Sequence, residues 1–269
     1  MIIDCNAYLG HWATRRLRYN TPEGLLKLMD RAGIAKACVS SASAILYRNS
    51  QSGNEELAEM IEGHCDRLIP FAVINPAYAG WQKDLRWCCE LLGAKGLRLY
   101  PSYHNYALRD GRCAELVKAA TEMDLLVSIP IRQVDYRQRH WLVNAPDLSL
   151  ADLAALAAAH PKARFILLEG AGYMGSDLVK KAKDLPTNYW IEISRPDAVY
   201  TDEIGELLKA LGAERLVFGS GIPFKYPEPA VLRIEVMNAS PEDKERIRNG
   251  NIGALLAQLQ GRSPAGSNR

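Results

Sequence analysis

Strand-like and helix-like segments alternate along almost the whole chain, and this alternation constrains the fold more than any other feature. Apolar segments that predict strands cover residues 2–6, 36–41, 67–76, 95–101, 125–132, 164–170, 188–194 and 215–221. Segments with helical features follow them at 21–33, 54–64, 81–93, 111–124, 148–161, 176–184, 201–212 and 229–238, and residues 241–260 predict one or two closing helices. About eight strand–helix units in 269 residues predict an α/β fold, a single (β/α)8 TIM barrel with extra C-terminal helices.

The first predicted helix carries clear end signals. Thr21 suits the N-cap, Pro22 suits the first helical position, and Glu23 favours the positive end of the helix dipole. Gly33 can end the helix, whereas Gly24 weakens it slightly because glycine is a poor helix former. These signals predict a helix between Thr21 and Gly33.

A doubly wound parallel sheet is the rival architecture. It is disfavoured because no glycine-rich phosphate-binding fingerprint follows the first strand. No linker divides the chain, so we expect one domain over residues 1–260. Residues 261–269 are polar and contain Gly, Pro and Ser, which predicts a flexible tail.

Composition excludes several classes of partner. The 33 Lys and Arg against 31 Asp and Glu give a net charge of +2, which does not favour nucleic acid. No apolar run approaches the ~20 residues of a membrane span, and no signal peptide is evident. The six cysteines form no CxxC pair, so we expect reduced thiols in a cytoplasmic protein. A homo-oligomer remains open, because two-fold pairing is common among soluble proteins.

Polar side chains recur near the carboxyl ends of four predicted strands. Because successive strand residues face opposite sides, the polar ones can share the inward face while their apolar neighbours pack under helices. The inward set is Arg98, Tyr100, Arg132, Glu169, Glu192 and Ser194. Active sites of such barrels lie at the carboxyl ends of the strands, so this set predicts a binding site there.

Five segments together resemble the amidohydrolase superfamily, specifically its amidohydrolase-related branch of TIM-barrel metal-dependent hydrolases and decarboxylases. They are residues 2–10 (IIDCNAYLG), 95–101 (KGLRLYP), 164–175 (RFILLEGAGYMG), 215–224 (RLVFGSGIPF) and 248–256 (RNGNIGALL), the last with Asn251 at the family's characteristic asparagine. The resemblance spans nearly the whole chain and implies the same barrel.

The departures from this family fall on its metal ligands. The family's histidine and aspartate ligand positions hold Asn6 and Tyr8 on the first strand, Glu169 on the sixth and Gly221 on the eighth, and the fifth-strand position falls near Pro130. Only Asp4 matches, and it is not by itself a metal ligand. Since zinc needs three or four N, S or O ligands, we expect no bound metal and no other cofactor.

Charge in the predicted cavity then has to be balanced by side chains. We hypothesise that Arg98 and Arg132 pair with Asp4, Glu169 and Glu192 in the volume that a metal and its ligands would take. The alternative for the two arginines is a clamp for a substrate carboxylate or phosphate.

The candidate residues divide into two groups. We expect Glu169 and His104 to be catalytic, with His104 on the loop 101–110 above the active face, where a histidine can exchange protons near neutral pH. The expected substrate-binding residues are Asn6, Tyr8, Arg98, Tyr100, Arg132, Glu192 and Ser194. Most candidates also have a purely structural interpretation. Glu169 and the two arginines can form internal salt bridges, Asn6 can be a hydrogen-bonded strand-end amide, and Tyr8 and Tyr100 can be pocket wall. The loop of His104 can be a plain lid, and the charged loop 135–141 can be solvated.

Two functions from different classes follow. One is a metal-independent hydrolase or decarboxylase that acts on a small carboxylate-bearing, anionic molecule. The other is a binding or scaffolding barrel that has lost the metal-dependent chemistry, since a fold alone does not fix function. An open cavity favours ligand binding, and a cavity filled by paired charges favours the structural alternative.

Overall fold

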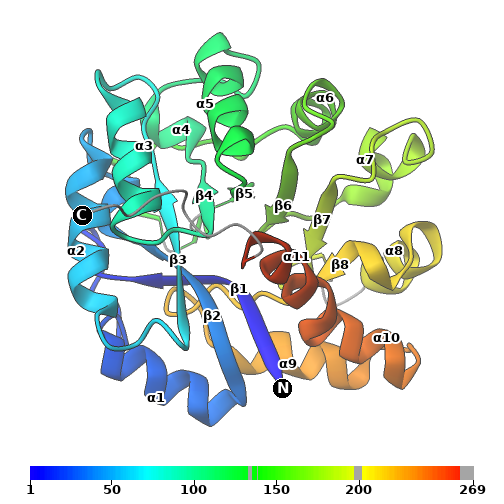
Figure 1. Cartoon of the computed structure of the whole chain (residues 1–269). Coiled ribbons are helices and arrows are strands. Elements are labelled where there is room, and N and C mark those ends of the chain that lie inside the picture. Colours follow the sequence, from blue (N-terminus) through cyan, green and yellow to red (C-terminus); the bar gives the residue numbers. More distant parts are fainter. Residues whose placement is uncertain (133–134, 138, 197–201, 261–269) are drawn as a thin grey trace.

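A computed structural model describes residues 1–132, 135–137, 139–196 and 202–260. Eight parallel strands form one sheet in sequence order (Figure 1). They are β1 (Ile2–Leu9), β2 (Ile34–Ser41), β3 (Leu68–Val73), β4 (Gly96–Arg98), β5 (Leu126–Pro130), β6 (Arg164–Leu168), β7 (Tyr189–Glu192) and β8 (Leu216–Val217). This confirms the predicted TIM barrel. The predicted tail, 261–269, lies outside the described residues.

The ring closes through the segment that follows β8. Tyr8 donates its backbone N–H to the carbonyl of Ile222 over 2.8 Å, and Gly221 donates to the carbonyl of Asn6 over 2.8 Å. Ala7 and Ile222 form a parallel bridge. The residues after β8 are therefore held against the end of β1, which brings the sixth and eighth strand ends beside Asn6.

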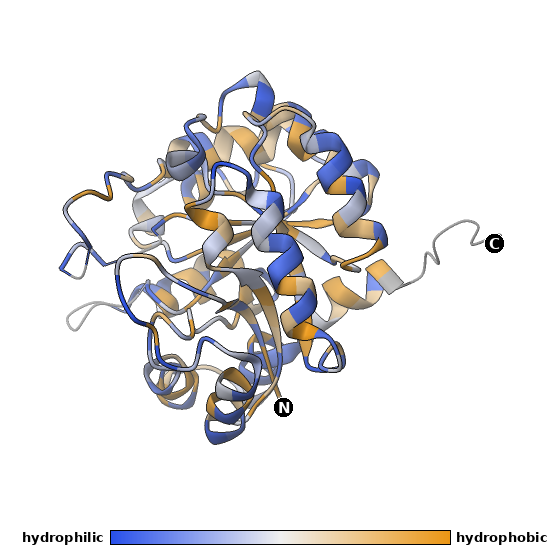
Figure 2. Ribbon diagram, turned by 90° about the vertical axis from the view of Figure 1, so that its left-hand side faces the viewer, coloured by the Kyte–Doolittle hydropathy of each residue, from blue (hydrophilic) through white to orange (hydrophobic). Residues whose placement is uncertain are grey.

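Helices surround the ring of strands (Figure 1). The α-helices are α1 (Pro22–Ala32), α2 (Ser50–Ile61), α3 (Trp81–Glu90), α4 (Pro101–His104), α5 (Gly111–Glu122), α6 (Leu150–Ala159), α7 (Asp177–Lys180), α8 (Glu203–Leu211), α9 (Glu228–Val236), α10 (Pro241–Glu245) and α11 (Asn251–Gln260). Short turns of other helix types are η1 (Ser43–Ile45), η2 (Tyr173–Gly175), η3 (Ala213–Arg215) and η4 (Arg246–Gly250). Hydrophilic and hydrophobic residues alternate along these helices in Figure 2, as expected for amphipathic helices that cover a core.

The end signals of α1 act as the sequence predicts. The Thr21 hydroxyl accepts the N–H of Gly24 over 3.2 Å, and Pro22 occupies the first turn. Gly33 takes the left-handed conformation that ends the helix, with φ of 69°. These local signals therefore fix where the helix begins and ends.

The amino-terminal end of the barrel is closed by α11. Its side chains Ile252, Leu255, Leu256 and Leu259 belong to one buried apolar cluster with inward residues of the strands, among them Phe71. The amide of Asn251 donates to the carbonyls of Ala213 and Leu216, both over 2.7 Å, and so anchors α11 beside β8. Because this end is filled, the carboxyl end is where the barrel can open to a ligand.

Two further predictions can be compared with the structure. All six cysteines are free thiols, and four of them are buried. Across the described ranges, no helix combines the length and apolar character needed to cross a membrane.

Candidate functional site

An open pocket of about 1070 Å³ lies at the carboxyl end of the barrel. Its walls come from the loops that follow β1, β5, β6, β7 and β8 and from residues of α1 and α9. Three predicted site residues, Arg132, Glu169 and Ser194, line it. The position agrees with the general rule that TIM-barrel sites lie at the carboxyl ends of the strands.

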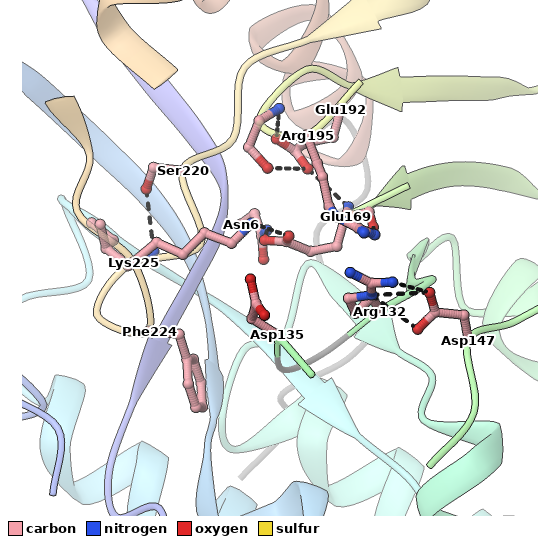
Figure 3. A network of polar contacts seen from close by, with 12 residues as sticks. Asn6, Arg132, Asp135, Asp147, Glu169, Glu192, Arg195, Ser220, Phe224 and Lys225 are labelled. Atoms are coloured by element: carbon pink, nitrogen blue, oxygen red, sulfur yellow. Dashed lines mark hydrogen bonds and ion pairs between the residues drawn. The ribbon is translucent and has the colours of Figure 1, made fainter. Parts of the chain in front are cut away.

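Glu169 is the centre of the polar contacts on the pocket floor (Figure 3). It follows β6 with φ of 59°, a conformation that is unfavourable for a residue with a side chain and that turns the carboxylate toward β1. Its Oε1 accepts the side-chain N–H of Asn6 over 2.8 Å, and its Oε2 forms an ion pair with the Lys225 ammonium. Glu169 is 5% exposed, whereas the Lys225 side chain is 38% exposed. The pair therefore joins a buried anion to a cation that solvent or ligand can reach.

Glu192 supports Glu169 from β7. Its carboxylate accepts the backbone N–H of Glu169 over 2.9 Å, the Ser194 hydroxyl over 3.0 Å and the Ser194 backbone N–H. Burial, followed by the nearby Glu169 carboxylate, raises the pKa of Glu192 to about 7. Glu192 thus fixes the backbone of both neighbours, is itself fully buried, and is not among the described residues that line the pocket.

The end of β8 makes room for the ion pair. Gly221 has φ of 76°, and a Cβ there would lie 2.6 Å from Glu169 Oε1. Next to it, Ser220 donates its backbone N–H over 3.1 Å and its hydroxyl to the Asp4 carboxylate. Burial raises the pKa of Asp4 to about 7. Asp4 therefore ties β1 to the segment after β8, and Gly221 leaves the space that Glu169 fills.

The predicted pairing of Arg98 with a carboxylate is wrong. Arg98 is fully buried, and its guanidinium donates to the carbonyls of Cys5 and Ala7 and to the Ser128 hydroxyl, each over 3.0 Å. It also lies 4.8 Å from the Tyr8 ring centroid. Because these partners use its donors inside the barrel, Arg98 holds strands together below the pocket.

Arg132 also has a partner that the sequence did not indicate. Its guanidinium forms an ion pair with Asp147 over 2.9 Å, outside the predicted set of carboxylates. It lies over the Tyr136 ring, 4.1 Å from the centroid. Arg132 nevertheless lines the pocket, since the ion pair fixes it at the wall with its side chain 21% exposed.

His104 does not lie on an exposed loop as expected. It ends the short helix α4, is 4% exposed, and its Nε2 lies 3.2 Å from the carbonyl of Ala44. Burial lowers its pKa to about 4. It is not among the described residues that line the open pocket. Within the described structure its side chain is therefore enclosed by the fold and separate from the open pocket.

Tyr8 and Tyr100 form an apolar cluster beside the pocket. Both are almost fully buried and pack with Trp12 and Leu17. The Tyr8 ring meets the edge of Phe224 with centroids 5.1 Å apart, and Phe224 lines the pocket. The two tyrosines therefore support the wall, and neither is among the described lining residues.

Sequence reasoning missed several basic residues of the site. Lys225 lies four residues after Gly221, and Arg195 directly follows the strand-end Ser194; its guanidinium donates to the Glu169 carbonyl over 3.0 Å. Arg16 and Arg18 line the pocket from the loop after β1. Their positions in loops after strands were a usable signal, but strand alternation does not extend into loops.

The described part of the pocket floor holds few side chains of the types that usually bind metal ions. Among the described residues, no three His, Cys, Asp or Glu side chains gather closely enough to hold one. The Glu169 carboxylate on the floor is already bound by the Lys225 ammonium. A second cation at that carboxylate would face the repulsion of the first.

Comparisons with known proteins agree with this fold. A family model described as Amidohydrolase matches residues 11–257. The fold is similar to 2,6-dihydroxybenzoate decarboxylase from Rhizobium, with a TM-score of 0.71 at 16% identity over 96% of this chain and 98% of that chain. A 5-carboxyvanillate decarboxylase from Sphingomonas paucimobilis gives 0.68 at 13% identity over 95% and 98%.

A dihydroxybenzoic acid decarboxylase from Polaromonas sp. JS666, solved with bound manganese and the inhibitor 2-nitroresorcinol, gives a TM-score of 0.63 at 18% identity over 89% and 86%. No curated protein matches the sequence. At these identities the solved structures establish the fold alone, whereas the family model covers most of the chain. The chain belongs to the amidohydrolase family.

Proposed function

We propose that this protein is a metal-independent hydrolase or decarboxylase that acts on a small carboxylate-bearing molecule. The observation that carries the proposal is the Lys225–Glu169 ion pair on the floor of an open pocket. It lies beside Asn6 and Gly221, two positions at which the family resemblance implies metal ligands. We also propose that the protein is cytoplasmic.

Lys225 supplies the positive charge in this scheme. Its ammonium is positioned to bind a substrate carboxylate or to stabilise the negative charge that develops when a carbon–carboxylate bond breaks or water attacks a carbonyl. Arg195, which also lines the pocket, is fixed by the Glu169 carbonyl and adds a second cation. Fixed charges of this kind act strongly because they need not reorganise during the reaction.

Glu169 is the proton carrier in this scheme. Its carboxylate lines the pocket and can take a proton from water or the substrate and return it to a product carbon or leaving group. Asn6 orients it through the 2.8 Å hydrogen bond, and Glu192 holds its backbone. Ser194 adds a hydroxyl at the pocket wall.

The similar solved structures support the substrate class. Two of them are decarboxylases whose names specify aromatic carboxylates as substrates. The open pocket is large enough for a molecule of that kind, since small-molecule sites usually measure ~300–1,000 Å³. A non-catalytic binding barrel is the second candidate, favoured by one observation: the charge of Glu169 is already neutralised by Lys225.

The test is turnover by the purified protein in the presence of EDTA, with a panel of aromatic and aliphatic carboxylates. Products and released carbon dioxide are measured. We expect Lys225→Met and Glu169→Gln each to reduce turnover by about 10²–10³-fold, the usual loss when one charge-stabilising group is removed. Lys209→Met is the matched control, because Lys209 is exposed on α8 and does not line the pocket.

Three results discriminate the alternatives. Activity that disappears with EDTA and returns with manganese would contradict metal independence. Full turnover in Lys225→Met would show that Lys225 is not needed for catalysis and would contradict the proposal. Carboxylates that bind through Lys225 without any turnover would establish the binding barrel instead.

A further inference from the structure

The pocket concentrates positive charge far beyond the rest of the chain. Arg15, Arg16 and Arg18 reach it from the loop after β1, and Arg132 and Arg137 from the segment after β5. Arg195, Lys225 and Arg233 complete the set, whereas Asp135 and Glu169 are its described acids. Eight cations less two anions give +6 among the described lining residues, although the whole chain carries only +2. The remainder of the protein is thus net acidic, and the pocket attracts anions.

The charges lie at two depths. On the floor, Glu169, Ser194 and Ser220 are at most 8% exposed, and Lys225 and Arg195 reach the pocket beside them. At the rim, Arg16 and Arg18 are exposed. A ligand that enters therefore meets one group of cations at the opening and another at the base.

Several of the lining cations are already balanced by a carboxylate. Lys225 pairs with Glu169, Arg132 with Asp147, and Arg137 with Asp135. Within the described ranges, neither Arg16 nor Arg18 forms an ion pair with another side chain. Among the described lining residues, Arg16 and Arg18 are therefore exposed cations without a carboxylate partner; on the floor, Arg195 also lacks an ion pair and donates to the Glu169 carbonyl.

We infer that the substrate carries two separated anionic groups, one held on the floor beside Lys225 and Arg195 and the other held at the rim by Arg16 and Arg18. This inference rests on the proposed function and narrows its substrate class to dicarboxylates, or to carboxylates with a phosphate at the far end. Guanidinium groups bind both anions through paired N–H donors.

Pocket size supports the same conclusion. At about 1070 Å³ the pocket is at the upper limit of ordinary ligand sites, ~300–1,000 Å³. A short monocarboxylate that reaches Lys225 leaves most of this volume, and all of the rim charge, unused. A longer dianion can contact the cations of the floor and those of the rim at the same time.

The experiment measures binding by calorimetry for matched acids: hexanoate against adipate and octanoate against suberate. We expect the diacids to bind about tenfold tighter than the monoacids at low ionic strength, with the advantage reduced by added salt because the rim is exposed. 6-Phosphonohexanoate carries a phosphonate in place of the second carboxylate. Comparison of its affinity with that of the diacids tells whether the second anion is a phosphate-type group or a carboxylate.

Charge reversal at the rim locates the second anion. Arg16→Glu with Arg18→Glu should abolish the diacid advantage and weaken monoacid binding much less, because the single anion of a monoacid is held on the floor. The matched control is Lys83→Glu with Arg86→Glu, which reverses two exposed cations on α3 away from the pocket and should preserve the advantage. All four side chains are exposed, so loss of folding is not expected to obscure the result.

Equal affinity for monoacids and diacids, an advantage that survives reversal at the rim, or no binding by any diacid would overturn the inference. Failure of the proposed function looks different. In that case the diacids bind with the rim-dependent advantage, but no carboxylate in the panel is turned over.

Discussion

The interior of the barrel and its mouth each contain a basic side chain that gathers polar groups from several strands, with different consequences. Arg98 in the interior is fully buried, and backbone carbonyls and a hydroxyl accept its hydrogen bonds. Lys225 at the mouth pairs with Glu169 and keeps 38% of its side chain exposed. Depth in the barrel therefore decides whether a cation only links strands by hydrogen bonds or can also contact a ligand.

The comparison also shows how the chain neutralises buried charge. In the interior, carbonyl dipoles from the β1 and β2 strands surround the guanidinium, and the Tyr8 ring lies over it. At the mouth, a full carboxylate balances the ammonium. Dipoles suit a permanent charge that never leaves its place, whereas an ion pair can exchange its partner for a ligand anion.

The largest effect is expected for Arg98→Met. It leaves the carbonyls of Cys5 and Ala7 buried without these donors, so the free energy of unfolding should fall by about 3–5 kcal/mol. Arg132→Met is the control at the mouth, where loss of a partly exposed ion pair should cost about 1 kcal/mol or less. Urea unfolding measures both. Equal losses would mean that depth does not separate the two regions.

Gly221→Ala tests the space that the ion pair occupies. A Cβ at Gly221 meets Glu169 Oε1 at 2.6 Å and adds the strain of a positive φ, so we expect a loss of about 2–3 kcal/mol. Gly33→Ala has a similar φ with nothing within 4 Å of the new Cβ and should cost about 1 kcal/mol. Thermal unfolding compares the two, and equal costs would show that Glu169 moves aside freely.

Glu192→Gln should change how stability depends on pH. Because the pKa of Glu192 rises from 4.5 to about 7 on folding, the folded state binds the extra proton in this range, and stability falls as pH rises through it. The slope is at most ~1.4 kcal/mol per pH unit for one proton. Relative to the glutamine variant, the unchanged protein should lose stability from about pH 4.5 to about pH 7. Parallel urea-midpoint profiles would contradict the assignment.

The smallest effect on activity is expected for His104→Gln. Since His104 does not line the pocket, turnover at neutral pH should be unchanged, in contrast to the ~10²–10⁴-fold loss of a general acid or base. Its pKa falls from 6.5 to about 4 on folding, so its contribution to stability is lost as pH falls through that range. The variant should therefore lose less stability in acid. A large fall in turnover would restore the catalytic role that the sequence suggested.

The sequence predicted the fold well because strand and helix signals are local. The apolar segments, the cap at Thr21 and the glycine at position 33 each act within a few residues, and their order along the chain implies the barrel. Alternation also placed Glu169 and Ser194 at the pocket. It could not assign partners, because the contacts of Arg98 and Arg132 join strands and loops far apart in the sequence.

By itself, then, the sequence determined the barrel, the face on which the site lies and the side chains at the positions where the family resemblance implies metal ligands. Only the tertiary structure decided that Lys225 reaches Glu169, that Arg98 is enclosed by carbonyls and that His104 is buried. The physical reason is range. Backbone preferences and side-chain alternation act between neighbours along the chain, whereas ion pairing and burial depend on which distant segments the closed ring brings into contact.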